Sequence, residues 1–81
     1  MKVYELLDAP EKWTQGHYHR VDENGQESWC LYGAVTMCYP TPRTEVLGKI
    51  IDRIKRGPEA WNDDPIRTYE QVIALAKELD I

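Results

Sequence analysis

Two histidines stand two residues apart in this sequence, at His17 and His19. If the segment is a strand, both imidazoles lie on one face and could hold a metal ion together with a carboxylate such as Asp22 or Glu23. The spacing specifies no third ligand, however, and two histidines this close are common by chance. The pattern therefore favours structural or solvent-facing histidines, and we predict no metal site here.

Cys30 and Cys38 are the only thiols. A catalytic cysteine needs a neighbouring base and an electropositive setting that lowers its pKa. We expect Cys30 in the first turn of a helix, where the helix dipole acts in that direction. A cysteine within an apolar run is nevertheless more often a small buried residue. We predict reduced thiols in both positions.

The densest polar segment runs from Trp61 to Thr68. Its carboxylates Asp63 and Asp64 could support hydrolysis, but adjacent side chains usually point apart and no metal-binding spacing accompanies them. The segment can equally be scaffolding, with Asx turns, a helix cap at Thr68 and an ion pair at Arg67. As a binding surface it would use aromatic rings for stacking and basic groups as donors. The ligand-binding candidates are then Trp61, Asn62, Asp63, Arg67, Trp13, His19 and Arg20.

The chain shows no glycine-rich phosphate loop and no Ser-His-Asp motif in a recognisable context. We therefore expect no catalytic residue and no cofactor. The leading hypothesis is a small non-enzymatic binding module, such as a phage-type accessory or anti-defence protein, that engages a host protein or sequesters a small anionic, nucleotide-like ligand. One alternative is a small metal-dependent hydrolase or transferase using Asp63, Asp64 and His17 or His19. Another is a structural protein that dimerises through exposed Trp and Tyr.

Size and charge limit the remaining possibilities. Eighty-one residues predict a single domain, 1–81, and a net charge of −4 disfavours duplex nucleic acid and anionic membranes as partners. No segment is long and apolar enough to span a membrane, and the first residues do not open a signal peptide, so we expect a cytoplasmic protein. The aromatic residues are three Trp and five Tyr without Phe, a set enriched at interfaces, so a homo-oligomer is possible.

The first half of the chain is expected to form two helices around a hairpin. Apolar spacing predicts a short helix over 3–13, interrupted at Pro10, either by a kink or by a new turn that starts there. Alternation around 17–21 and the Asn24-Gly25 pair predict a small β-hairpin near residues 17–28 with a type I′ turn. Ser28 should cap a buried helix over 29–39, in which Gly33 allows close approach of another backbone.

The second half is expected to form two further helices. One begins at Thr41-Pro42, carries a stripe of apolar residues and stops at residues 55–58. Residues 61–65 then form a loop, and Thr68 with Gln71 makes a capping box for the last helix. The stripes that face the core are Val46, Leu47, Ile50, Ile51 and Ile54, then Val72, Leu75, Ala76 and Leu79. The predicted fold is mainly α, a compact bundle of about four short helices with a small β-hairpin.

These segments resemble a family of small proteins of unknown function found in bacteria and their phages. The resemblance covers nearly the whole chain and lies in three motifs: Trp13 with Gly16; Trp-Cys-Leu-x-Gly-Ala over 29–34; and Trp-Asn-Asp-x-Pro-x-Arg-Thr over 61–68. The region between the first and second motifs looks shorter than in typical relatives. The resemblance supports the fold expectation and implies no catalytic residue, substrate or cofactor.

Overall fold

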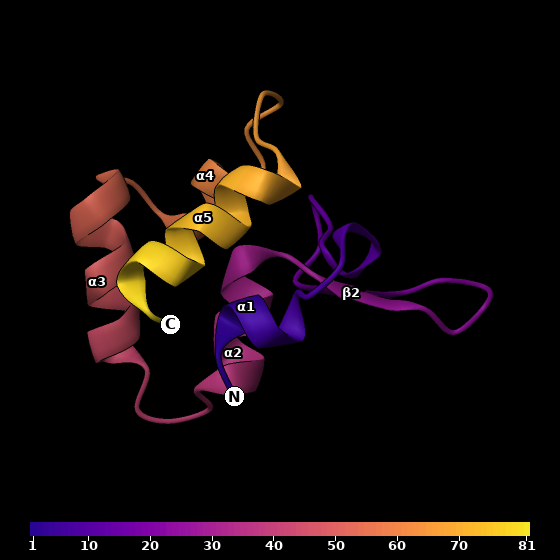
Figure 1. The fold of residues 1–81 in the computed structure, drawn as a ribbon, viewed down its shortest axis with the longest axis horizontal. Helices are drawn as coiled ribbons and strands as arrows, with labels where there is room; N and C mark the ends of the chain where they lie inside the picture. The colour runs from indigo at the N-terminus through magenta and orange to yellow at the C-terminus, as the bar shows by residue number, and fades with distance from the viewer.

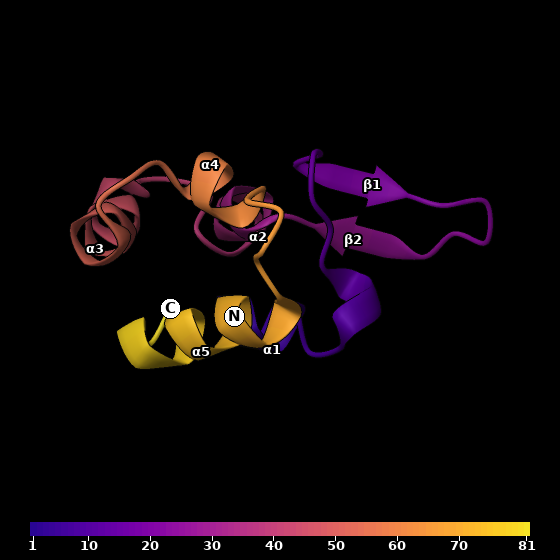
Figure 2. The same cartoon turned by 90° about the horizontal axis from the view of Figure 1, so that it is seen from above.

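The computed structural model describes residues 1–81 and arranges short helices in two layers (Figures 1 and 2). One layer holds α1 and α5, and the other holds α2 and α4 with a hairpin that projects from one end (Figure 2). Helix α3 lies at the opposite end. The elements are α1 (Val3–Leu6), the 3-10 helix η1 (Pro10–Lys12), β1 (His19–Val21), β2 (Glu27–Trp29), α2 (Leu31–Cys38), α3 (Thr44–Ile54), α4 (Pro58–Asn62) and α5 (Tyr69–Leu79).

The expected first helix is divided in two. Helix α1 ends at Leu6, and Pro10 occupies the first turn of η1. Proline lacks an N–H and has a fixed φ, so it suits a first turn and breaks a helix interior. Of the two alternatives at Pro10, the new turn is therefore the one that forms.

The predicted hairpin is present, with β1 and β2 antiparallel. Its turn is not type I′, because that turn needs a positive φ at both central residues and Asn24 does not have one. Gly25 alone is left-handed, at φ 81°. Asp22 instead organises the loop: its Oδ1 accepts hydrogen bonds from the backbone N–H of Asn24 at 2.8 Å and of Gln26 at 2.9 Å. The polar Asx turn thus replaces the expected two-residue turn.

Helix α2 is the most buried helix, as expected, but it starts two residues later than predicted. Cys30 is its N-cap, with Sγ accepting from the backbone N–H of Gly33 at 3.3 Å. Ser28 lies in β2 and does not cap the helix, because pairing with β1 keeps residues 27–29 extended. A Cβ on Gly33 would stand 1.9 Å from the carbonyl oxygen of Tyr18. The close backbone approach predicted at this glycine is confirmed.

The region from 41 to 62 differs most from expectation. Helix α3 begins at Thr44, so Thr41 is not its cap and Pro42 is not in its first turn. Its end is as predicted, with Lys55 in the left-handed conformation. Pro58 then starts α4. The sequence had instead predicted a helix stop at residues 55–58 and a loop at 61–65.

Helix α5 follows the sequence prediction closely. Thr68 Oγ1 accepts from the N–H of Gln71 at 3.2 Å, and Gln71 Oε1 accepts from the N–H of Thr68 at 3.1 Å. The capping box is therefore confirmed. The buried core joins residues from all layers: Val3, Leu7, Trp29, Leu31, Ala34, Val35, Ile50, Val72, Leu75, Ala76 and Ile81.

The mainly α fold with one small hairpin is confirmed, and the number of helices is five where about four were expected. Helix α4 accounts for the difference. None of the helices has the length and apolar character that crossing a membrane requires.

Candidate functional site

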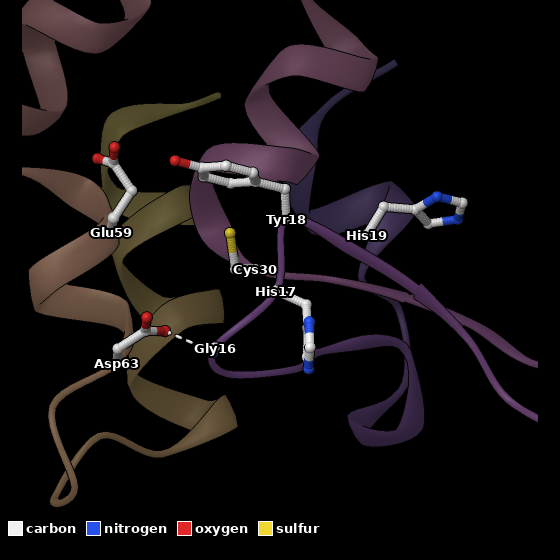
Figure 3. A pocket seen from close by; sticks show the side chains of 7 residues that line it. All are labelled: Gly16, His17, Tyr18, His19, Cys30, Glu59 and Asp63. Atoms are coloured by element: carbon white, nitrogen blue, oxygen red, sulfur yellow. Dashed lines mark hydrogen bonds between the residues drawn. The ribbon is translucent and has the colours of Figure 1, made fainter.

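A pocket of about 500 Å³ opens between α4, the N-terminal end of α2 and the segment that leads into β1 (Figure 3). We call it the acidic pocket. Its lining contains two carboxylates and neither lysine nor arginine. The residues that line it are Gly16, His17, Tyr18, His19, Cys30, Glu59 and Asp63.

Glu59 and Asp63 stand on one wall because they are four residues apart on α4 and its C-cap, which places both on one helix face. Asp63 is held in place: its Oδ1 accepts from the backbone N–H of Gly16 at 3.0 Å and from Asn62 Nδ2 at 2.9 Å (Figure 3). No other side chain of the protein makes a hydrogen bond or ion pair with Glu59. A partner's donor can therefore reach this carboxylate without breaking an existing pair.

The two histidines line the acidic pocket but do not form a metal centre. His19 Nε2 lies 3.0 Å from Glu27 Oε1, and its ring stacks on Trp29 with centroids 5.2 Å apart. Both imidazole rings point away from Glu59 and Asp63 (Figure 3). No group of three or more His, Cys, Asp and Glu side chains is placed to hold a metal ion.

Cys30 lies at the base of the acidic pocket and is buried. Burial raises the pKa of its thiol, and the hydrogen bonds from the backbone of Gly33 and Tyr32 oppose this only in part. Cys30 is the N-cap of α2 and does not lie in its first turn. The backbone N–H groups at the start of the helix lower the thiol pKa in the expected direction, but desolvation of the thiolate is the larger effect, so the pKa is raised overall. Cys38 likewise has a raised pKa through burial, and both cysteines are free.

Asn62 is 0% exposed and joins three parts of the chain. Its Oδ1 accepts from Trp13 Nε1 at 2.6 Å and from the N–H of Leu31 at 3.0 Å. Its Nδ2 donates to the carbonyl of Thr14 at 3.1 Å and to Asp63. Every polar atom of this side chain is thus engaged, so Asn62 and the edge of Trp13 serve the fold in this structure and present nothing to a ligand.

The other predicted contacts around the third tryptophan are also internal. Arg67 lies 3.9 Å from the centre of the Trp61 ring, and its Nε donates to the carbonyl of Trp61 at 2.9 Å. Asp64 pairs with Arg56, with 3.4 Å between its Oδ2 and the guanidinium. Of the ligand-binding candidates only His19 and Asp63 line the acidic pocket, and Arg20 lines no pocket.

A second, apolar pocket of about 210 Å³ borders the first, and Tyr18 and His19 line both. The rings of Tyr18 and Tyr32 are 5.3 Å apart at its edge. Trp29 is 6% exposed, and its indole N–H has no hydrogen-bond partner in the chain. The lining residues of this apolar pocket are Tyr18, His19, Trp29, Tyr32, Gly33, Thr36 and Met37.

Sequence reasoning missed Glu59 and the apolar pocket. A signal for Glu59 was present, because Gly57-Pro58 is typical of a helix start as well as of a helix stop. A helix beginning at Pro58 would have placed Glu59 and Asp63 on one face. Tyr18 and Tyr32 come together through the contact of Gly33 with the Tyr18 backbone. The glycine indicated a close backbone approach, but no local pattern indicated that Tyr18 is the partner.

The structure is that of a small, mainly α domain with one hairpin and an acidic pocket at its base. The chain belongs to a family of unknown function (DUF6197), whose family model matches residues 2–79. The resemblance to a family of unknown function is therefore confirmed. Comparisons with curated proteins and with solved structures gave no match.

Proposed function

We propose that this chain is a small non-enzymatic binding module that engages a partner protein by seating a basic group of that partner in the acidic pocket. The observation that carries the proposal is the pocket lining, which places Glu59 and Asp63 together without a lysine or arginine. A carboxylate pair attracts a guanidinium or ammonium group and gives it hydrogen-bond acceptors. The role of a phage-type accessory protein is part of this proposal, because a small acidic binder without catalytic motifs is typical of that class.

The pocket lining favours a basic group over the small anionic ligand expected from the sequence. Of the expected cationic donors, Arg67 is held by Trp61 and Gln71. Arg20 lies outside the lining, and His19 points away from the carboxylates (Figure 3). A phosphate in this pocket would meet two carboxylates and no fixed positive charge, which is repulsive at short range.

The side-chain geometry also supports binding over hydrolysis. The alternative with a metal-dependent enzyme needs Asp63 and Asp64 to converge with His17 or His19. Asp64 instead pairs with Arg56, and its Oδ1 accepts from the N–H of Ile66 at 3.1 Å. The carboxylate pair of the pocket is Glu59 with Asp63, and the histidine rings turn away from it (Figure 3).

The test is an NMR titration of the labelled protein with N-acetyl-arginine amide, and separately with adenosine monophosphate. We expect the arginine derivative to shift the amide signals of Gly16, Tyr18 and Asp63, and the nucleotide to leave them unchanged. Glu59→Gln should weaken the arginine complex by about fivefold, since one exposed charge pair contributes up to about 1 kcal/mol.

Glu45→Gln is the matched control, because Glu45 is exposed on α3 and lines neither pocket. It removes the same charge from the molecule and should leave the affinity unchanged. Shifts of the pocket signals by the nucleotide alone would contradict the proposal. Equal weakening by both variants would also contradict it, because the effect would then be one of net charge.

A further inference from the structure

Strand β1 has one paired edge and one free edge. Its register with β2 pairs His19 with Trp29 and Val21 with Glu27. The flanking hydrogen bonds run from the N–H of Cys30 to the carbonyl of Tyr18 and from the N–H of Asp22 to the carbonyl of Gln26. In an antiparallel ladder hydrogen-bonded pairs alternate with non-hydrogen-bonded ones, so the backbone groups of His19 and Val21 point away from β2.

No segment of the chain covers this outer edge. The N–H groups and carbonyls of His19 and Val21 have no other hydrogen-bond partner in the protein, and all residues of β1 are exposed. β1 lies at the margin of the molecule, with β2 on its inner side (Figure 2). An uncovered strand edge offers alternating donors and acceptors to another extended chain.

The surroundings of the edge indicate which chain it would accept. Gly16, His17 and Tyr18 directly precede β1 and line the acidic pocket, so this pocket lies next to the N-terminal end of β1. The apolar pocket borders the same two residues, Tyr18 and His19. Exposed Tyr18 and Val21 add apolar surface along the edge.

We infer that the outer edge of β1 accepts an extended segment of a partner protein as a third strand, with a basic side chain of that segment in the acidic pocket and an apolar side chain in the apolar pocket. This inference rests on the proposed function and specifies how the partner is held. Charge complementarity identifies the occupant as a basic segment, because both the pocket and the whole chain, at −4, are acidic. A second copy of this chain carries the same negative charge and is disfavoured.

The probe is the peptide acetyl-Arg-Val-Thr-Val-Thr-Arg-amide. It alternates apolar and polar side chains and places arginine at both ends, so it can reach the acidic pocket in either strand direction. On binding we expect the amide hydrogens of His19 and Val21 to exchange about tenfold more slowly, because hydrogen bonds now protect them. Binding should also weaken with Glu59→Gln, as for the capped arginine.

Two N-methylated forms of the peptide separate strand pairing from side-chain binding. One form is methylated on the odd peptide nitrogens and the other on the even ones, so only one set faces β1. We expect methylation of that set to weaken binding about tenfold or more, through the loss of backbone hydrogen bonds, while the other form binds like the parent.

A variant of the protein tests strand pairing by changing β1 in place of the peptide. Val21→Pro removes the outward N–H of β1 while leaving the bonds to β2, since proline fits an edge position whose N–H faces solvent. We expect it to weaken the peptide complex more than Val21→Ala does, because both variants lose the valine side chain and only the proline variant also loses the N–H. If Val21→Pro unfolds the hairpin, the methylated peptides still decide the question.

The outcomes distinguish the two proposals. Glu59-dependent binding of the peptide with equal affinity for both methylated forms would overturn the strand addition and leave the proposed function standing. No binding of the peptide or of the capped arginine would overturn both. In the absence of peptide, slower exchange of the His19 and Val21 amide hydrogens at higher protein concentration would also overturn the inference. A second copy of the chain would then occupy the edge.

Discussion

At the scale of single residues, the polar side chains of this protein divide between those that hold the fold and those that face the pockets. Asn62 is the clearest member of the first group, since its amide joins Trp13, Thr14 and the start of α2. Glu59 is the clearest of the second, since no other side chain pairs with it. Both lie on α4, only three residues apart, but Asn62 is fully buried and Glu59 is half-buried.

Replacing Asn62 tests the structural role. Asn62→Ala leaves the buried N–H of Leu31 and the indole N–H of Trp13 without their acceptor. Each unsatisfied buried group is costly, so we expect a loss of roughly 2–4 kcal/mol in the free energy of unfolding, measured with urea. Asn24→Ala is the control, because the Asn24 side chain is exposed in the hairpin loop. A loss below about 0.5 kcal/mol for Asn62→Ala, like the one expected for the control, would refute the role.

At the scale of elements, the contact between α2 and residues 16–18, the segment that leads into β1, decides where the pockets form. Gly33 lets the Tyr18 backbone lie against α2, and this contact places Tyr18 beside Tyr32 and above Cys30. The carbonyl of Tyr18 then accepts from the N–H of Cys30, which extends the hairpin ladder to the start of α2. Hairpin and helix therefore act as one unit that carries the apolar pocket and one wall of the acidic pocket, whose other wall is α4.

A methyl group at Gly33 should disrupt this unit. Because the added Cβ would stand 1.9 Å from a backbone oxygen, the Tyr18 segment has to move. We expect Gly33→Ala to reduce the free energy of unfolding by roughly 3 kcal/mol or more, and to broaden or shift the amide signals of residues 16–19.

Gly48 is the matched control for that variant. It lies on α3, and a Cβ there would meet nothing within 4 Å. Alanine favours a helix over glycine, so Gly48→Ala should increase the free energy of unfolding by roughly 0.5–1 kcal/mol. If both variants were stabilising, the close approach at Gly33 would not exist as described.

At the scale of the whole molecule, Val3 and Ile81, from opposite ends of the sequence, meet in the core. The N–H of Val3 donates to the carbonyl of Ile81 at 2.6 Å, and the hydroxyl of Tyr39 donates to the same carbonyl at 2.8 Å. Ile81 is 1% exposed and packs with the core. Helices α1 and α5 thus form their layer through contacts between residues far apart in the sequence (Figure 1).

Shortening the side chain of Ile81 tests how much its packing in the core stabilises the fold. Ile81→Ala leaves a cavity between the layers, and we expect a loss of roughly 2–4 kcal/mol in the free energy of unfolding. Ile66→Ala removes the same atoms from a side chain that is 74% exposed, so its effect should stay within about 0.5 kcal/mol. Comparable losses for the two variants in urea unfolding would show that Ile81 contributes no more than a surface residue.

The sequence by itself determined the features that depend on neighbouring residues. The capping box of α5, the end of α3 and the hairpin follow from local backbone chemistry. Each of these three depends on residues within a few positions, so it stays valid whatever the rest of the chain does. Glycine at position 33 predicted a close backbone approach, but its partner, the backbone of Tyr18, was decided by packing.

Only the tertiary structure decided which polar residues face a pocket. Asn62, Asp63 and Asp64 are adjacent polar residues of similar size, yet one is buried, one lines the acidic pocket and one pairs with Arg56. Their directions depend on how α4 packs against α2 and on the segment around Trp13, which are contacts across more than thirty residues of sequence. Desolvation at Cys30 is decided in the same way, because burial is a property of packing and has no local pattern.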